Sequence, residues 1–289
     1  MDLTTSDDQP LVSVIIPTRN AGKIIGHCLE SIQSQSYRSL EIIVVDNYSS
    51  DETRRVVEKY HAKFITAGPP PPYNNFFTAP IQRRVGAEHG RGAFLFFVDA
   101  DMILSQGLIE ECVKRCEKGA DAVTIPEISF GTGFWAKCKQ IERACYINDP
   151  KIEAPRFIRK SAYVQAGGWS EMFGAFDDWN MAKRLRACNL KIDHCTNNYI
   201  LHDEGHLTLR GLFFKKYRMG KTIDLRHISG QNLSVISYQL TPFRILLLRK
   251  VVFFTKNPIY ILGVFLMKLV EATGMLIGFL MQTFRFHNS

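Results

Sequence analysis

Short apolar runs alternate with helical patterns over the first 125 residues, and this alternation limits the possible folds more than any other feature. Residues 12–16, 41–46 and 93–98 are apolar runs that predict strands, and the segments between them have the apolar spacing of helices. Such alternation builds βαβ units, in which helices cover a parallel sheet. The run FLFFV is apolar throughout, which is typical of burial on both sheet faces. The chain is therefore predicted to begin with an α/β unit.

The pattern can be read into individual elements along the chain. The predicted strands are residues 12–16, 41–46, 63–66, 93–98, 122–124, 156–158 and 199–201. The predicted helices are residues 23–33, 51–61, 81–89, 107–118, 134–146 and 178–187, followed by a basic helical pattern at 209–219. We expect a domain boundary near residue 228, with a catalytic domain over 1–228 and a helical extension over 229–289.

The net positive charge of the chain comes entirely from its last part. Residues 1–204 carry 24 basic and 26 acidic side chains, whereas residues 205–289 carry 12 basic and only 2 acidic ones. A nucleic-acid-binding protein would carry its basic surface on the folded domain, so we do not expect nucleic acid as a partner. Basic residues beside apolar sequence favour an anionic membrane surface instead.

The first residues of the chain and its cysteines indicate the cellular compartment. MDLTTSDDQP is polar and acidic and contains no visible signal peptide. The seven cysteines form no C-x-x-C pair, which favours reduced thiols over zinc ligands or disulfides. Together these features predict a cytosolic location for the catalytic part.

Polar clusters follow three of the predicted strands. In α/β sheets, ligands bind beyond the carboxyl ends of the strands. The third cluster places two carboxylates two residues apart after a buried strand, where their charges need a cation, and oxygen ligands of this kind suit Mg²⁺ or Mn²⁺ bound together with substrate phosphates. The alternative is a solvated acidic turn. The clusters are Pro17-Thr18-Arg19-Asn20, Asp46-Asn47 and Asp99-Ala100-Asp101.

Five segments in a fixed order extend this interpretation. They are VSVIIPTRN, VVDNYSSDET, QRRVGAEHGRGAFLFFVDADM, GGWSE and DDWNMAKRLRACNLKI. Together they resemble the inverting GT-A glycosyltransferases of family two, over about residues 10–205. The resemblance implies a GT-A, Rossmann-like mixed sheet with helices on both faces. It also implies a nucleotide-diphospho-sugar donor, a divalent cation, Mg²⁺ or Mn²⁺, and inversion at the anomeric carbon.

The resemblance assigns donor-side roles to residues of this chain. Asp46 matches the carboxylate that contacts the nucleobase, and Asn47 stands where a second Asp is frequent. Asp99 and Asp101 match the motif that holds the cation and the diphosphate. The remaining positions that match donor-binding residues are Pro17, Thr18, Arg19, Asn20 and Arg83.

A second constellation matches the acceptor side of the family. Asp178 matches the acid that deprotonates the acceptor, and Asp177 replaces the usual Glu before it. An inverting transfer needs one such base within hydrogen-bond reach of the attacking oxygen. The alternative is an acidic helix start, which the helix dipole favours. Arg184 matches a basic position farther along the same helix, where it could pair with these acids.

Two further sites that match the family each have a second, purely structural explanation. Gly167 and Gly168 with Trp169 match a turn beside the acceptor pocket, where the indole offers a stacking face; an ordinary turn with a core tryptophan explains the same residues. His202 follows the strand predicted at 199–201 and matches a histidine that completes the metal site in related enzymes. Most isolated histidines are structural or solvated.

The end of the chain is apolar and basic. Residues 259–281 are long enough to cross a bilayer, although Lys268 and Glu271 in the middle make a lipid-facing span costly unless they pair. Residues 244–256 mix bulky apolar and basic side chains, as interfacial helices do. Three interpretations follow: helices lying in the interface, one transmembrane segment, or helices packed on the catalytic domain without lipid.

The prediction is therefore a metal-dependent inverting glycosyltransferase with a membrane-associating extension, at the cytoplasmic face of the cell membrane and either monotopic or with one C-terminal span. Its acceptor is expected to be lipid-linked, either a polyprenyl phosphate or a lipid-linked glycan. The alternative is a non-catalytic, membrane-associated nucleotide-sugar-binding protein on the same fold. Nucleotidyl transfer fits less well, since PTRNAGK lacks the Gly-rich, basic phosphate loop.

Overall fold

The computed structural model describes residues 9–68, 78–145, 147, 153–169, 177–221 and 258–287, without the side chains of 177–179 and 283–287. Ten strands lie in this part: β1 (Val12–Thr18), β2 (Leu40–Asp46), β3 (Lys63–Thr66), β4 (Phe94–Phe97), β5 (Met102–Leu104), β6 (Ala122–Thr124), β7 (Glu127–Thr132), β8 (Pro155–Arg159), β9 (Ile192–His194) and β10 (Ile200–His206). The described helices are α1 (Ile25–Gln33), α2 (Thr53–Glu58), α3 (Ala79–His89), α4 (Leu108–Glu117), α5 (Gly133–Ala144), α6 (Lys160–Gln165), α7 (Asp177–Ala187), α8 (Leu209–Gly220) and α11 (Pro258–His287).

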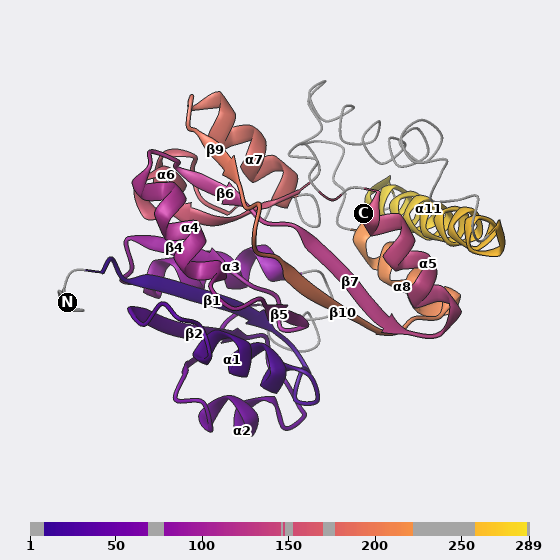
Figure 1. Cartoon of the computed structure of the whole chain (residues 1–289). Helices are drawn as coiled ribbons and strands as arrows, with labels where there is room; N and C mark the ends of the chain where they lie inside the picture. Colours follow the sequence, from indigo (N-terminus) through magenta and orange to yellow (C-terminus); the bar gives the residue numbers. More distant parts are fainter. Residues whose placement is uncertain are drawn as a thin grey trace.

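Seven strands form the main sheet, in the order β3-β2-β1-β4-β8-β6-β9 (Figure 1). The strands from β3 to β4 are parallel, as the alternating pattern of the first 125 residues predicts. β8 runs antiparallel to both of its neighbours, so the sheet as a whole is mixed. A second sheet has the order β5-β10-β7 and leads away from the main sheet.

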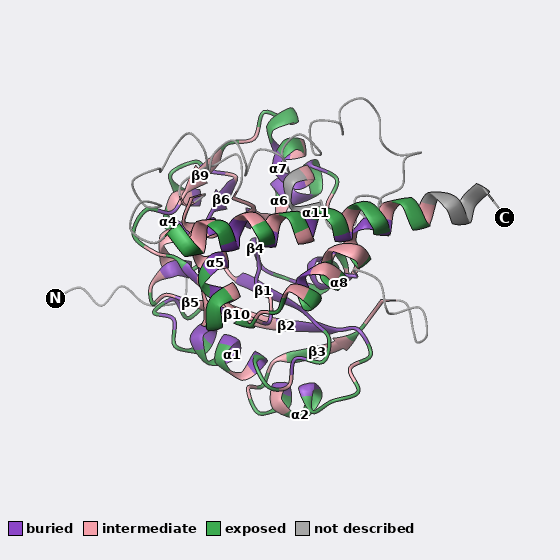
Figure 2. Ribbon diagram, turned by 90° about the vertical axis from the view of Figure 1, so that its right-hand side faces the viewer, coloured by how far each residue is buried: buried purple, intermediate pink, exposed green. Residues whose placement is uncertain are grey.

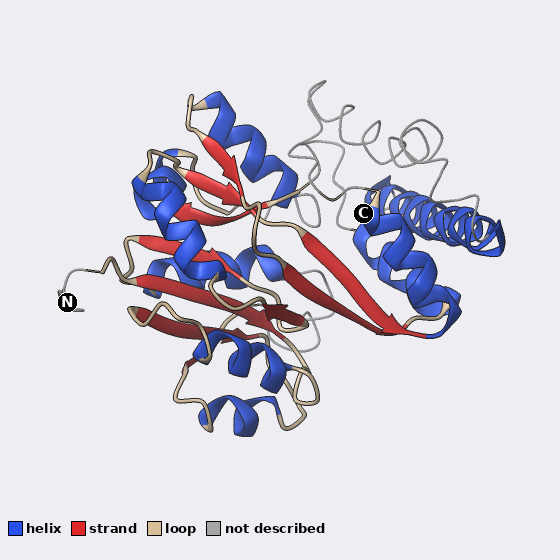
Figure 3. Ribbon diagram, viewed as in Figure 1, coloured by secondary structure: helices blue, strands red, loops and turns tan. Residues whose placement is uncertain are grey.

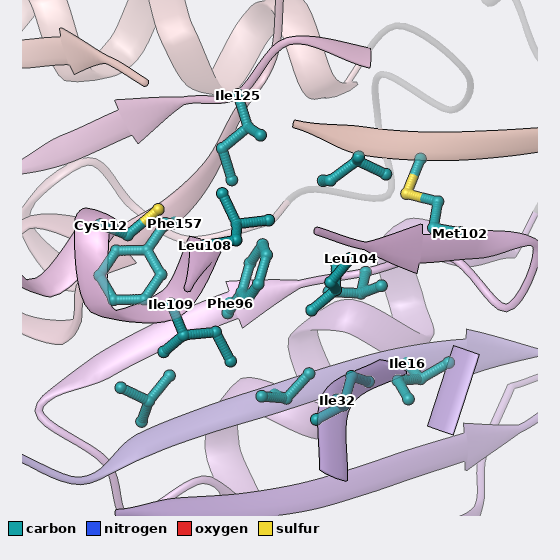
Figure 4. Packing of buried hydrophobic residues seen from close by; sticks show 14 of the residues in the cluster. Ile16, Ile32, Phe96, Met102, Leu104, Leu108, Ile109, Cys112, Ile125 and Phe157 are labelled. Carbon is teal, nitrogen blue, oxygen red and sulfur yellow. The ribbon is translucent and has the colours of Figure 1, made fainter. Parts of the chain in front are cut away.

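Helices cover both faces of the main sheet (Figure 3). The alternation of side chains along β1 explains how, because Val14 and Ile16 pack in the cluster that contains α1 and α4, while Ile15 packs on the other face with α3, α6 and α7. Figure 4 shows the larger cluster, in which Phe96 and Phe157 lie beside residues of α4. The core thus holds the strands rigidly where their carboxyl ends meet.

A separate group of helices gathers at the far end of β7 and β10 (Figure 1). Helix α5 follows β7 directly, α8 follows β10, and α11 packs against both helices. A small apolar cluster joins them; its buried members are Cys138, Leu212, Val264 and Met267. α11 includes a stretch, Pro258–Gln282, that is long and apolar enough to cross a membrane.

Most of the predicted elements are present within two or three residues of the expected bounds. Four short elements were not predicted, namely β5, β7, α6 and β9. The boundary expected near residue 228 and the helix expected over 244–256 lie outside the described residues. The seven cysteines, all within the described part, are free thiols, as predicted.

Candidate active site

The loop after β1 is tied to the loop after β2. Asn20 adopts a left-handed conformation, with φ of 50°. Its side-chain oxygen accepts a hydrogen bond from the backbone N–H of Ser50 at 2.9 Å, and its own N–H donates to Ser49 Oγ at 2.7 Å. Asn tolerates this conformation better than most residues. Pro17 and Thr18 lie buried in the strand, and Arg19 is exposed at the rim.

The second predicted cluster lies directly beside the first. Thr18 and Asp46 are partners in the register of β1 and β2. Asp46 accepts the N–H of Ser49 at 2.8 Å, while buried Asn47 donates from its backbone to the Thr18 carbonyl at 2.9 Å and from its side chain to Thr78 Oγ1 at 2.7 Å. The structure therefore brings the two predicted donor-binding loops together at one edge of the sheet.

Gln82 in α3 joins these strand ends and was not predicted. Its Nε2 donates to the carbonyl oxygens of Thr18 at 2.8 Å and Val45 at 2.7 Å, and its Oε1 accepts from Thr78 at 3.0 Å. A buried amide whose N–H₂ group and oxygen both have hydrogen-bond partners holds those partners in one arrangement. Gln82 is the first residue of the segment QRRVGAEHGRGAFLFFVDADM, but a single Gln on a helix forms no recognisable sequence pattern.

Asp99 lies between two buried guanidinium groups. Arg83 Nη2 is 2.7 Å from Asp99 Oδ1, and Arg156 Nη2 is 3.3 Å from Asp99 Oδ2. Burial alone would raise the pKa of Asp99, but Arg83 and Arg156 outweigh it and hold this pKa well below its usual range. Asp99 is therefore ionised and paired with two protein groups in this structure. Its role in holding the cation and the diphosphate stays a prediction.

Asp101 faces His202 instead. Asp101 Oδ2 lies 3.3 Å from His202 Nε2, and the other oxygen, Oδ1, is buried without a hydrogen-bond partner among the described residues. His202 Nδ1 lies 3.4 Å from Glu127 Oε2. Burial alone would lower the pKa of His202, but its contacts with Asp101 and Glu127 raise this pKa to about 9. The structure thus brings two of the predicted metal ligands together.

A divalent cation fits this arrangement in part. Within the described ranges, no group of three His, Cys, Asp or Glu side chains could hold a metal alone. However, Asp101 has an unsatisfied buried oxygen, and Mn²⁺ accepts oxygen and imidazole ligands. Cations that act on nucleotide phosphates are commonly held by one or two protein groups together with phosphate oxygens and waters. Asp101 follows β4 and His202 lies within β10, not after the strand as predicted; together they supply two protein ligands of this kind.

Glu127 connects the histidine to two arginines. Glu127 Oε1 accepts from Arg156 Nε at 2.6 Å, and its Oε2 lies 3.0 Å from Arg143 Nη1. Burial opposes its ionisation, but Arg156, the hydrogen bond with His202 and Arg143 hold the pKa of Glu127 well below its usual range. Neither Glu127 nor Arg156 was predicted, because each is a single charged residue and their neighbours come from four different elements.

The Gly167-Gly168-Trp169 turn is built into the core. Gly168 has a left-handed φ of 63°, and a Cβ there would lie 3.1 Å from the hydroxyl of Tyr163. Trp169 is only 3% exposed; its ring meets Phe97 edge-on at 5.1 Å and lies 5.0 Å from the Arg83 guanidinium carbon. This burial favours the alternative of a core tryptophan over an indole that stacks on an acceptor.

The predicted acceptor residues lie on α7. Asp177 and Asp178 form the first turn of this helix, and their side chains lie outside the described part of the structure. Arg184, farther along, donates from Nη1 to the carbonyl oxygens of Ala166 at 3.0 Å and of Gly168. It therefore supports the glycine turn from α7. The role of Asp178 as a base stays a prediction.

Comparisons with known proteins agree with this architecture. Residues 13–178 match the model of glycosyl transferase family 2. The curated relatives include the uncharacterized glycosyltransferase EpsJ of Bacillus subtilis, 26% identical over 151 residues, which are 52% of this chain and 41% of EpsJ. Another is the GalNAc(5)-diNAcBac-PP-undecaprenol beta-1,3-glucosyltransferase of Campylobacter jejuni, 32% identical over 38% of this chain and 36% of that protein. The chain thus spans less than half the length of these relatives.

Two solved structures show the same fold. One is the mannosyltransferase PcManGT from Pyrobaculum calidifontis in complex with GDP-Man and Mn²⁺, with a TM-score of 0.62 and 16% identity over 94% of this chain and 88% of that one. The other is S. aureus TarS 1–349 in complex with UDP-GlcNAc, with a TM-score of 0.52 and 16% identity over 73% and 66%. The predicted GT-A-like mixed α/β fold, with a long apolar C-terminal helix, is confirmed.

Proposed function

Because this chain belongs to glycosyltransferase family 2, we propose that it transfers a sugar, with inversion, from a nucleotide-diphosphate donor to an acceptor. The observation that carries the proposal is the buried Oδ1 of Asp101, which has no hydrogen-bond partner among the described residues and lies beside His202, just beyond β4, the neighbour of β1. A buried carboxylate oxygen without a partner is costly unless a ligand satisfies it.

The residues of this site divide the work of donor binding. The nucleoside would lie over the loops that carry Asp46 and Asn20, whose conformations are held by hydrogen bonds between the loops. Asp101 and His202 would hold Mn²⁺ or Mg²⁺, and Asp99 is the third predicted ligand of this cation. When bound, the cation supplies positive charge to the departing diphosphate. Arg83, which pairs with Asp99 two residues before Asp101, is the proposed basic residue on the donor side.

Asp178 is the proposed base on the acceptor side. A carboxylate here would take the proton from an attacking hydroxyl, with Asp177 and Arg184 placing the first turns of α7 and Gly168 and Trp169 forming the turn beside it. The acceptor is proposed to be lipid-linked, because the chain ends in a long apolar helix with a strongly basic flank. If the attacking group were a phosphate, it would already be ionised and would need little help from a base.

Donor hydrolysis and transfer assays test this proposal. Asp178→Asn is expected to abolish transfer to a hydroxyl acceptor while nucleotide binding in Mn²⁺ stays intact, because this residue acts on the acceptor side only. Near-normal transfer by Asp178→Asn would reject the base and favour a phosphate acceptor. Absence of both hydrolysis and transfer in the unmodified protein, with retained nucleotide-sugar binding, would instead favour the non-catalytic alternative.

A further inference from the structure

One face of α11 carries a stripe of exposed apolar side chains. From Ile259 to Leu269 the exposed apolar side chains follow one another at intervals of three or four residues, and those from Leu276 to Met281 begin two helical turns farther along the same side of the helix. Leu262 is 71% exposed and Leu269 is 63% exposed. The complete stripe is Ile259, Leu262, Leu266, Leu269, Leu276, Ile277, Leu280 and Met281. Figure 2 shows this exposed side turned outward along the helix. Large apolar side chains gathered on one exposed face are typical of an interaction surface.

The opposite face of α11 is held by a ring of two buried glutamates and two half-buried lysines. Lys268 and Glu271 of α11 meet Lys139 and Glu142 of α5, and each lysine contacts both glutamates. The Lys139–Glu271 contact between the helices is 3.1 Å, and Glu271 is only 5% exposed. The two charges that made a simple membrane span costly are therefore used in docking to the protein.

Close backbone contact fixes α11 against α8 as well. A Cβ on Gly274 would lie 2.5 Å from the carbonyl oxygen of Phe213, and Cβ atoms on Gly220 or Gly278 would also overlap backbone of the facing helix. Small residues of this kind allow two helices to approach each other directly. The position of α11 relative to α5 and α8 is thus determined on two sides.

This docking argues against a membrane-crossing orientation. Helices α5 and α8 are each joined directly to the β7–β10 sheet, so α11 cannot cross a bilayer without either breaking the ion ring or taking both helices into the hydrocarbon. Those helices expose Lys137, Lys215 and Arg218, and charged side chains at that depth are strongly unfavourable. With the axis parallel to the bilayer surface, only the apolar stripe enters the lipid.

The charges beside the stripe indicate which lipids it fits. Helix α8 exposes Arg210, Lys215 and Arg218 and contains no acidic residue. In the described part of α11 the one acidic side chain is the buried Glu271. α8 and α11 lie side by side on the same face of the molecule (Figure 2). An apolar stripe with a basic flank is complementary to a surface of anionic headgroups.

We propose that the exposed stripe of α11, flanked by α8, binds an anionic lipid bilayer with the helix lying in the plane of the interface. The proposal names the membrane partner of the site proposed above, but it rests on the packing of α5, α8 and α11 and needs no donor or acceptor. A second copy of this chain is the competing occupant of the stripe, and the test below separates the two.

Vesicle sedimentation tests the surface on the full-length protein. With vesicles of phosphatidylcholine and phosphatidylglycerol, Leu262→Glu and Leu269→Glu should each weaken binding at least about tenfold, since each replaces a lipid-facing leucine by a charge. Val164→Glu is the matched control: it changes an equally exposed apolar residue on α6 and should leave binding unchanged. Equal binding by all three variants would overturn the proposal. A stripe-dependent dimer without vesicle binding, seen by light scattering, would overturn it as well.

Depth measurements then distinguish lying from crossing. Tryptophan is introduced singly at Leu262, Leu269 and Leu276, and its quenching by lipids brominated at different depths is compared with that of the parent protein. The proposal expects one shallow depth for all three positions. Deep quenching at 269 with shallow quenching at 262 and 276 would show a crossing helix and refute the in-plane orientation. Because no turnover is measured, loss of transferase activity would leave this result untouched.

Discussion

Replacing Glu127 by glutamine is the perturbation that most sharply tests the charge network around the proposed metal site. Glu127 is nearly buried and accepts from Arg156 at 2.6 Å and Arg143 at 3.0 Å, with His202 at 3.4 Å. Glutamine keeps the shape but removes the negative charge. It also places an amide N–H₂, which can only donate, among three donors.

The expected magnitude follows from these contacts. Removing one member of a buried ion pair costs about 3–5 kcal/mol, because the partner charge is left in the interior. Arg156 keeps its contact with Asp99 and Arg143 keeps Glu204 at 3.8 Å, so we expect the lower end, about 3 kcal/mol. For a chain of this size that corresponds to a fall in Tm of roughly 6–12 °C. Since Glu127 also orients His202, Mn²⁺ affinity should fall by about 10-fold or more.

The assay is thermal unfolding with and without Mn²⁺, together with a calorimetric Mn²⁺ titration. Glu58→Gln is the matched control, because Glu58 pairs with Arg54 at 2.9 Å on an exposed helix and should change neither quantity measurably. If Glu127→Gln melts and binds Mn²⁺ like the unmodified protein, then Glu127 neither stabilises this network nor orients His202, and the reasoning is refuted.

Three further predictions concern the core and the surface. Trp169→Ala should lower the free energy of unfolding by about 3–5 kcal/mol in urea titrations, because the ring fills the core against Phe97. An unchanged urea midpoint would contradict this core role and favour the predicted role of Trp169 beside the acceptor. Gly86→Ala should cost about 1–3 kcal/mol in the same assay, since its Cβ would overlap the buried side chain of Ile15; a neutral effect would contradict the close packing of α3 on β1. Glu111 is a pH-sensitive site: burial opposes its ionisation, but a backbone N–H, an arginine and an asparagine hold its pKa below the usual value. The stability it contributes is therefore present above the unfolded pKa and lost as pH falls, so Glu111→Gln should flatten the loss of stability between about pH 5 and 3, and an unaltered slope would exclude this role.

The fold could be predicted where local patterns decide the structure. Strands β1, β2 and β4 are apolar runs whose burial on both faces follows from their composition, and the polar residues at their ends identified the edge of the site. Elements that the rest of the fold determines could not be predicted. β5 and β9 are three residues long, and β7 alternates weakly, so no periodicity distinguishes them from loops.

The candidate site shows the same division. Asp101 and His202 were predicted as metal ligands from the resemblance and lie together in the structure. Arg156 and Glu127 were not predicted because their roles depend on contacts among β7, β8, β10 and α5. No residue spacing along the chain indicates those contacts. Glu271 presents the related case in the C-terminal helix: the sequence shows a charge in an apolar segment, and only the packing of α11 on α5 shows what neutralises it.

The most direct test of the central claim is a calorimetric titration of UDP and GDP in the presence of Mn²⁺. The account predicts that at least one of them binds the unmodified protein, that EDTA abolishes this binding, and that Asp101→Asn weakens it at least about tenfold, whereas Glu117→Gln, an exposed carboxylate change on α4, has no effect. Nucleotide binding that is equally tight in EDTA and in Asp101→Asn would contradict it.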